Sequence, residues 1–371
     1  MLTLHHDGSL SMEVAVIGGG HGGYAAAAEI SEHGHSVRFW RRNAEDFQAV
    51  LANPTIKVKD FKGERDIAIA RPTTSLGEAV KGAELIVIPL PATTQESLAA
   101  DCALFWEDGQ VVFLPPGTFG SYIYLKAARD AGNLADVTFC ETGTLPYLAR
   151  KHGPASVVIS GYGKHLPTGC IPARNSDKAL AKLAQVYPAI HPIEDAMSAA
   201  LMNAGGIIHP PLIMMNAGPL EHFERWDIHN EGTQPAIRRT TDALDSERIS
   251  IRESLAYTAP HYPLADHYAK EGNEWMYGRG AHGTLTDSGD WREHIVLTEH
   301  RYMLEDTRLG LSMLSSIGKW TGVKTPIVNG FLAIGSAITG RDLYAEGRTL
   351  ENLGLAELGR DQMATLMREG I

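Results

Sequence analysis

Residues 14–23 read Val-Ala-Val-Ile-Gly-Gly-Gly-His-Gly-Gly, an apolar run that leads into Gly18-x-Gly20-x-x-Gly23. In such a pattern the first glycine permits a tight turn, the second lets the backbone approach a pyrophosphate, and the third lets a helix pack closely on a strand. The alanine-rich stretch that follows predicts this helix, whose N-terminus directs free N–H groups at the phosphates. A glycine triplet alone fits an ordinary turn equally well. Here a strand precedes it and a helix follows, so we predict a dinucleotide-binding unit with Gly18, Gly20 and Gly23 at the cofactor.

The second strand of this unit is predicted over residues 36–40, and the residues after it bear on the choice of cofactor. An Asp or Glu there would accept hydrogen bonds from the adenosine ribose and repel a 2′-phosphate. This chain has Arg41-Arg42-Asn43 instead. A guanidinium offers a planar fork of donors that suits a phosphate. We therefore expect Arg41 and Arg42 to bind the cofactor, which favours NADP(H) over NAD(H). A solvated basic turn is the alternative, and it would leave NAD(H) possible.

Composition bounds the class of protein. The 371 residues suffice for two domains, and 44% hydrophobic with 21% charged residues is typical of a globular protein. The net charge of −11 argues against nucleic acid or an anionic membrane as a partner. The three cysteines lack CxxC or metal-ligand spacing, so we expect buried thiols in the reducing cytoplasm. No apolar run approaches the ~20 residues that span a bilayer, and residues 1–11 lack the apolar centre of a signal peptide.

Strand-like and helix-like patterns alternate in the first half of the chain. Apolar runs begin at Leu85, Val111, Val137 and Ala155, and helix-like stretches include 93–105 and 121–132. This alternation predicts a mostly parallel, doubly wound sheet that binds its ligand at the carboxyl ends of the strands. Pro89 ends one of these strands, so we expect its loop to pass close to the cofactor. The alternative is that this proline only terminates the strand.

After about residue 190 the pattern becomes helical. Helices are predicted over 194–204, 211–226, 239–258, 291–319 and 326–339. The chain is therefore predicted to be an α/β protein. It comprises an extension over 1–11, a Rossmann-type dinucleotide-binding domain over 12–193, and an all-α catalytic and substrate domain over 194–371. A cleft between two such domains is a common place for a substrate to bind.

His209 is the first candidate for chemistry in the helical half. It lies in an apolar stretch, where a charged group would be costly, and is followed by Pro210 and Pro211, which can open a helix at its first turn. A rigidly held imidazole with a pKa near neutrality can transfer a proton at a carbonyl or imine. A hydrogen-bonded core histidine is the alternative. Asn216, seven residues on, could contact a substrate or only cap a neighbouring helix.

Arg301 and Asp306 form the second candidate. An Arg can bind a substrate carboxylate through two hydrogen bonds, and an Asp can orient a histidine and stabilise its cation. On a continuous α-helix, residues five apart do not share a face. We therefore predict a break near Leu304–Asp306, with Asp306 also able to cap a helix that starts at Thr307. The other histidines lack metal-ligand spacing, so no metal site is predicted.

Together these residues resemble the octopine/nopaline (opine) dehydrogenase family over roughly residues 12–345. The specific part is His209-Pro210 with Asn216-x-Gly218, followed about ninety residues later by Arg301-Tyr302-x-x-Glu305-Asp306 and then by Gly310-Leu311 and Thr325-Pro326. Glu141-Thr142, followed by Leu145-Pro146-Tyr147-x-x-Arg150, is also similar to a family segment. This ordered set is far narrower than a glycine fingerprint, and it favours a catalytic His209 over a core histidine.

The resemblance implies an NAD(P)H-dependent oxidoreductase that acts on CH–NH groups. An α-amino acid and a 2-oxo acid such as pyruvate would condense to an imine, which is then reduced to a secondary-amine dicarboxylate. By motif, His209 would be the acid/base group and Asp306 would orient it. Arg301 would bind a substrate carboxylate, while Glu141 and Thr142 would line the amino-acid side of the cleft. Closure of two domains would expel water and protect the imine.

The chain departs from the family pattern in two places. Arg41 replaces the acid of NAD-using members, which bears on cofactor choice. Gly205-Gly206 stands before His209, where a bulkier residue could contact the amino acid, so a wider or differently shaped pocket is expected. Two other functions remain open: simple reduction of a 2-oxo acid or ketose, and nucleotide binding without catalysis. The expected partners are small molecules. A homodimer is compatible with a helical domain, although no surface pattern indicates one.

Overall fold

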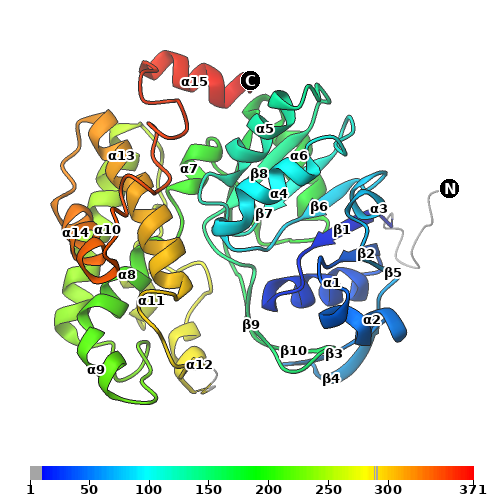
Figure 1. Cartoon of the computed structure of the whole chain (residues 1–371), viewed down its shortest axis with the longest axis horizontal. Coiled ribbons are helices and arrows are strands. Elements are labelled where there is room, and N and C mark those ends of the chain that lie inside the picture. Colours follow the sequence, from blue (N-terminus) through cyan, green and yellow to red (C-terminus); the bar gives the residue numbers. More distant parts are fainter. Residues whose placement is uncertain (1–10, 288, 290) are drawn as a thin grey trace.

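The computed structural model describes residues 11–287, 289 and 291–371. Eight strands form one twisted sheet in the order β12-β11-β8-β7-β6-β1-β2-β5 (Figure 1). Its strands are β1 (Glu13–Ile17), β2 (Ser36–Trp40), β5 (Arg71–Thr73), β6 (Leu85–Val87), β7 (Val111–Leu114), β8 (Thr138–Thr142), β11 (Leu166–Ile171) and β12 (Ile190–Pro192). Neighbouring strands run parallel, except that β11 is antiparallel to β8. This confirms the predicted α/β sheet domain.

Apolar side chains alternate between the two faces of the sheet. Val14 and Val16 pack on one face and Ala15 and Ile17 on the other, as the pleat of a strand requires. The first face is covered by α1 (His21–Glu32) and α6 (Ser176–Ala184), and the second by α4 (Gln95–Cys102) and α5 (Gly120–Asp130). Short elements complete the domain: η1 (Glu45–Phe47), α2 (Gln48–Ala52), α3 (Leu76–Val80), η2 (Ala92–Thr94) and η3 (Ala173–Asn175).

A second sheet of four strands, absent from the sequence predictions, lies beside the first. Its order is β4-β3-β10-β9, with β3 (Thr55–Asp60), β4 (Gly63–Ala68), β9 (Tyr147–Lys151) and β10 (Ser156–Tyr162). The apolar run that begins at Ala155 was expected in the main sheet. It forms β10 instead, paired with β3 and β9, so its expected place was wrong. Strand β9 contributes to the cavity described below.

The second half of the described chain is helical, as predicted. Its elements are α7 (Ala196–Ala200), α8 (Gly205–Met215), α9 (Ala217–His222), α10 (Pro235–Ser254), α11 (Ala265–Tyr268), α12 (Ala281–Asp287), η4 (Tyr302–Leu311), α13 (Ser312–Thr321), α14 (Pro326–Thr339) and α15 (Arg360–Glu369). Two helix starts were wrong. Helix α8 begins at Gly205, so Pro210 and Pro211 lie inside it, and the helix predicted from residue 291 begins about ten residues later.

Two features tie the halves together. Helix α15 returns to the sheet domain, where it lies near α5 and contacts β11 and η3 (Figure 1). Arg348 is buried between the halves and donates to the backbone oxygens of Ala92 and Thr118 and to the side chain of Gln95, at 3.1, 2.8 and 2.7 Å. The boundary predicted between residues 193 and 194 falls between β12 and α7. It stays a prediction, because α15 packs on the first half.

Candidate active site

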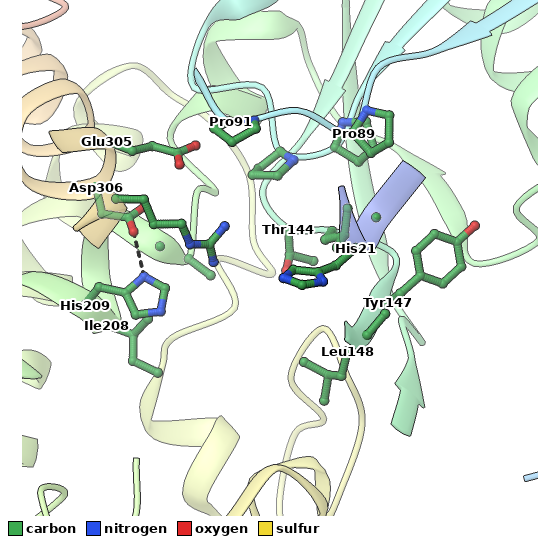
Figure 2. Close-up of a pocket in the computed structure, with 18 of the residues that line it drawn as sticks. His21, Pro89, Pro91, Thr144, Tyr147, Leu148, Ile208, His209, Glu305 and Asp306 are labelled. Atoms are coloured by element: carbon green, nitrogen blue, oxygen red, sulfur yellow. Dashed lines mark hydrogen bonds and ion pairs between the residues drawn. The ribbon is translucent and has the colours of Figure 1, made fainter. Parts of the chain in front are cut away.

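A cavity of about 370 Å³ lies where the two halves of the molecule meet. Its walls come from the glycine loop, the loops after β6 and β7, strand β9, helix α8 and the helix that begins at Tyr302. Figure 2 shows His21 and Pro89 on one side of this space and His209 with Asp306 on the other. The carboxyl ends of the parallel strands therefore open directly onto residues of the helical domain.

The glycine loop has the form that a dinucleotide needs. Gly18 has a φ of +121°, which favours glycine. A Cβ on Gly23 would lie 1.7 Å from the Gly18 carbonyl oxygen, so no larger residue fits there. A Cβ on Gly20 would meet nothing within 4 Å, and no side chain caps the helix that Gly20 precedes. The N-terminus of α1 thus faces open space with free N–H groups, as pyrophosphate binding requires.

Arg41 and Arg42 lie beside this loop but outside the cavity wall. The Arg41 side chain crosses Gly19, because a Cβ there would lie 2.3 Å from the Arg41 Cδ. Its guanidinium donates to the Asp46 carboxylate at 2.7 Å. Arg42 is exposed and lies 3.4 Å from the Asp101 carboxylate. Both guanidiniums are therefore near the end of β2, and each already has an acidic neighbour. Pro89 does line the cavity, next to Gly22.

His209 and Asp306 form a buried pair in the opposite wall. His209 lies on α8, and its Nδ1 is 2.7 Å from Oδ2 of Asp306 (Figure 2). The imidazole also stacks on Tyr302, with ring centroids 3.7 Å apart. Burial, followed by the positive Arg301 and His300, lowers the pKa of His209, and burial raises the pKa of Asp306 to about 7. The carboxylate and the stacked ring together fix the imidazole in place.

The segment that carries Arg301 and Asp306 does not break. Residues Tyr302–Leu311 form a π-helix that continues directly into α13, so the predicted break and the role of Asp306 as an N-cap were wrong. In a π-helix the backbone hydrogen bonds join residues five apart, which brings side chains at that spacing onto one face. Arg301 and Asp306 both line the cavity for this reason. The prediction assumed the residue spacing of an α-helix, which this π-helical segment does not have.

Arg301 lines the cavity and supplies positive charge to it. Burial opposes this charge, but Tyr302, Glu305 and Asp306 together outweigh it and hold the pKa of Arg301 above its ordinary value. Glu305 lines the same wall and accepts a hydrogen bond from the Ala92 N–H at 2.8 Å. This bond joins the π-helix to the loop that follows Pro89.

Three residues expected to bind substrate have structural roles instead. Glu141 is fully buried, and its carboxylate accepts hydrogen bonds from the Phe119 N–H and from the N–H and hydroxyl of Ser121, at 2.7, 2.9 and 2.5 Å. It caps the start of α5. Thr142 donates to the Pro167 carbonyl at 2.8 Å. We therefore correct the expectation that these two residues line the cleft, since neither reaches the cavity.

Asn216 is the third such residue. Its amide nitrogen donates to the Leu212 and Gly232 carbonyls at 2.8 and 3.0 Å, and its oxygen accepts from the Trp226 indole at 3.0 Å. Asn216 is buried and also lies outside the cavity wall. It therefore joins the end of α8 to the following loop rather than contacting a substrate, and its expected role as a substrate ligand is also corrected.

Comparison with known proteins follows the same division into two halves. Residues 13–114 match the N-terminal model of NAD-dependent glycerol-3-phosphate dehydrogenase, and residues 192–339 match the α-helical domain of NAD/NADP octopine/nopaline dehydrogenase. An opine dehydrogenase of Arthrobacter sp. (strain 1C) is 28% identical over 362 residues, which cover 94% of this chain and 96% of that protein. The chain is thus similar to the octopine/nopaline dehydrogenase family in its helical half and to an opine dehydrogenase over most of its length. It is an NAD(P)-dependent oxidoreductase of the opine dehydrogenase type.

Solved structures of opine dehydrogenases share the fold. An octopine dehydrogenase in complex with NADH and agmatine superposes with a TM-score of 0.72 at 17% identity, covering 96% of this chain and 98% of that one. A yersinopine dehydrogenase with NADP⁺ bound gives 0.66 at 13% identity, covering 96% and 98%. One relative thus holds NADH and the other NADP⁺.

Several wall residues of this opine dehydrogenase were not assigned roles from the sequence. His21 follows Gly20, and its Nδ1 accepts a hydrogen bond from the Lys151 N–H at 2.8 Å. Burial lowers the pKa of His21 to about 4, which keeps the ring neutral. Arg150, from β9, stacks on Trp291 with 3.7 Å between the guanidinium carbon and the ring centroid. Its place in the segment Leu145-Pro146-Tyr147-x-x-Arg150 was the available signal.

The glycine pair before His209 lies where α8 contacts the π-helix. Gly206 and Gly310 face each other, and a Cβ on Gly206 would lie 3.6 Å from the Gly310 Cα. A Cβ on Gly205 would lie 2.2 Å from Oδ1 of Asp306. Gly205 therefore lets α8 approach the π-helix closely enough for His209 to reach Asp306, and the expectation of a wider or differently shaped pocket at this point stays a prediction.

In the described part of the chain, no group of three or more His, Cys, Asp or Glu residues is arranged to hold a metal ion. Among the same residues, no helix is long and apolar enough to cross a membrane. The three cysteines are free and buried.

Proposed function

We propose that this protein condenses an α-amino acid with a 2-oxo acid such as pyruvate and reduces the resulting imine. The amine attacks the keto carbon, the keto oxygen leaves as water, and a C=N bond forms. Bound NAD(P)H supplies a hydride to the imine carbon, and the product is a secondary amine with two carboxylates. The observation that carries the proposal is the His209–Asp306 pair, which faces the glycine loop across one cavity.

His209 moves the protons in this scheme. Its Nδ1 is held by Asp306, which leaves Nε2 as the nitrogen available to a substrate. Protonated at Nε2, it donates to the departing hydroxyl so that the oxygen leaves as water. In the oxidative direction the neutral ring accepts a proton from the secondary amine. Asp306 stabilises the cationic form and the stacked Tyr302 restricts ring rotation, so proton transfer occurs at one defined position.

Two arginines, one from each half of the molecule, hold the two carboxylates. Arg301 precedes the π-helix and Arg150 lies on β9, and both line the cavity that contains His209. A guanidinium binds a carboxylate through two parallel hydrogen bonds. The substrates therefore bridge the halves, and binding favours closure, which excludes water from the imine. Asp306 and Glu305 lie close to Arg301, so this arginine is already oriented before substrate binds.

We further propose that NADP(H) is the preferred cofactor. Arg41 and Arg42 follow β2 where an acid would repel a 2′-phosphate. Arg41 already crosses the glycine loop beside the expected position of the adenosine, and a phosphate there would draw its guanidinium from Asp46. The comparison of kcat/KM for NADPH and NADH tests this directly. A ratio in favour of NADH would refute it.

The test of the reaction is turnover by His209→Ala with NADPH, pyruvate and a panel of amino acids. We expect a loss of at least ~100-fold, the scale of a lost general acid/base, with NADPH affinity retained. His222→Ala is the matched control, because His222 is exposed on α9 and outside the cavity. Wild-type turnover in His209→Ala would remove this residue from the mechanism. Reduction of pyruvate without any amine would identify a simple 2-oxo acid reductase instead.

A further inference from the structure

Beyond His209 the cavity ends in a chamber between strand β9 and residues 275–285 and 291 of the helical half. We call this region the side-chain chamber. Its wall consists of aliphatic and aromatic side chains that are wholly or partly buried: Leu148, Ile208, Trp275, Tyr277, Leu285 and Trp291. Figure 2 shows Ile208 next to His209, and Leu148 on the β9 side of the space near Tyr147. The chamber therefore lies beside the reacting centre, where the side chain of an amino-acid substrate would project.

The polar atoms of two aromatic wall residues bind elsewhere. The Trp275 indole N–H donates to the Tyr262 carbonyl at 3.2 Å. The Tyr277 hydroxyl donates to the Leu145 carbonyl at 2.6 Å and lies 2.8 Å from the Thr144 hydroxyl. Their rings, rather than these polar atoms, are what remain available to a ligand. Such a surface favours contact with an apolar group.

Two histidines complete the chamber without adding charge. His229 and His267 are buried, and several of their ring nitrogens have no hydrogen-bond partner within the described chain. Burial lowers the pKa of His267 to about 3 and holds that of His229 well below its ordinary value. Both rings are neutral at physiological pH. They can pack against a ligand but cannot neutralise an acidic or a basic one.

The carboxylates at the cavity are already engaged. Asp306 binds His209 at 2.7 Å, and Glu305 accepts from the Ala92 N–H at 2.8 Å. Glu293 lies 3.5 Å from the Arg150 guanidinium. Among the wall residues that the structure describes, none of these acids is left to receive a basic side chain. A guanidinium or ammonium placed in the chamber would lose its hydration without gaining a carboxylate to pair with.

We infer that the side-chain chamber binds a large uncharged side chain, aliphatic or aromatic, and discriminates against basic amino acids. This rests on the proposed function, since the chamber adjoins the proposed reacting centre. It distinguishes the chain from the octopine dehydrogenase relative that was solved with agmatine, a guanidinium compound. The driving force is removal of apolar surface from water against the ring faces and the aliphatic wall.

The experiment compares amino acids at fixed pyruvate and NADPH. L-Arginine and L-citrulline differ mainly in charge, and L-citrulline and L-phenylalanine differ mainly in polarity. We expect kcat/KM to fall in the order phenylalanine, citrulline, arginine, with at least about 100-fold between the first and the last. Isothermal titration of each amino acid into the NADPH-bound enzyme, without a 2-oxo acid, should give the same order of affinity. Arginine equal to or better than citrulline would overturn the inference, as would citrulline equal to phenylalanine.

A substitution in the wall separates charge from shape. Leu148→Glu places a carboxylate in the chamber, and Leu148→Gln is its uncharged control. We expect Leu148→Glu to raise the arginine-to-citrulline ratio of kcat/KM at least about 10-fold and Leu148→Gln to leave it unchanged. The ratio is taken within one variant, so a lower folded fraction cancels. If neither variant folds, the wild-type series still decides. If no amino acid in the panel is turned over, the proposed function itself is refuted. A preference for arginine would refute only the inference that the side-chain chamber discriminates against basic amino acids.

Discussion

Replacement of Gly205 by alanine tests whether the geometry of the His209–Asp306 pair controls the reaction. Gly205 is the first residue of α8 and lies against the Asp306 carboxylate, whereas the next residue, Gly206, lies against the backbone of Gly310. The two positions are adjacent in sequence and on the same helix. They therefore provide a substitution and its control that differ in one contact.

The size of the effect follows from the distances. A Cβ at position 205 would lie 2.2 Å from Oδ1 of Asp306, and ordinary contact begins near 3.4 Å, so the carboxylate must move by about 1 Å. That shift is large compared with the 2.7 Å hydrogen bond to His209. A displacement of this size at a catalytic group lowers the rate about 100-fold. At position 206 the nearest atom would lie 3.6 Å away, which is ordinary contact, so we expect a small change in rate.

The assay is the pre-steady-state oxidation of NADPH in the presence of pyruvate and the preferred amino acid. We expect Gly205→Ala to lose about 100-fold in the rate of reduction while NADPH affinity stays unchanged. Gly206→Ala should react at a rate close to wild type and unfold at the same or a higher urea concentration, since alanine favours a helix. A wild-type rate in Gly205→Ala would refute the role of Asp306. An equal loss in both variants would trace the effect to helix packing instead.

Three further outcomes are expected. Burial raises the pKa of Asp306 to about 7, so the His209–Asp306 pair holds its proton below that pH. The rate of the reductive reaction should therefore fall as the pH rises through about 7, and the rate of the oxidative reaction should rise. Asp306→Asn should remove this dependence on pH. Glu141→Gln should lower the free energy of urea unfolding by about 1.5–3 kcal/mol, because charge-assisted hydrogen bonds are lost, and should leave the KM for the amino acid within about 2-fold of wild type. A raised KM with an unchanged free energy of unfolding would instead support a role for Glu141 at the substrate. Arg41→Ala should lower kcat/KM for NADPH at least about 10-fold and leave kcat/KM for NADH unchanged. An equal loss of kcat/KM for both cofactors would contradict a contact between Arg41 and the 2′-phosphate.

The parts of the fold that local sequence determines were predictable. The glycine loop was one of these, because strand, turn and helix occur within about twenty residues and each has its own signal. The second sheet was missed, although Ile56 and Val58 are buried and Lys57 and Lys59 are exposed. Strict alternation of this kind is the mark of a half-buried strand, and it was available in the sequence.

Residues whose roles depend on distant partners were harder to assign. Glu141 is an acid within a strand, and nothing in its neighbourhood in the sequence indicates that it caps α5. That role arises because β8 and α5 are neighbours in the fold, about twenty residues apart in the chain. His209, in contrast, was singled out by its surroundings and by the family resemblance. Its partnership with Asp306 in the structure matches the expectation, and its role in the reaction remains a prediction.

The π-helix explains why the unbroken helix that carries Arg301 and Asp306 was not predicted. Regular α-helical geometry places Arg301 and Asp306 on different faces, so a prediction from spacing alone requires a break. A π-helix is rare because its hydrogen bonds are less favourable, and it persists where packing supports it. Here Gly205 and Gly310 let the two helices approach, and the His209–Asp306 bond lies across that contact. Because the unusual winding depends on a helix about one hundred residues earlier, no window of sequence around Asp306 contains the information that determines it.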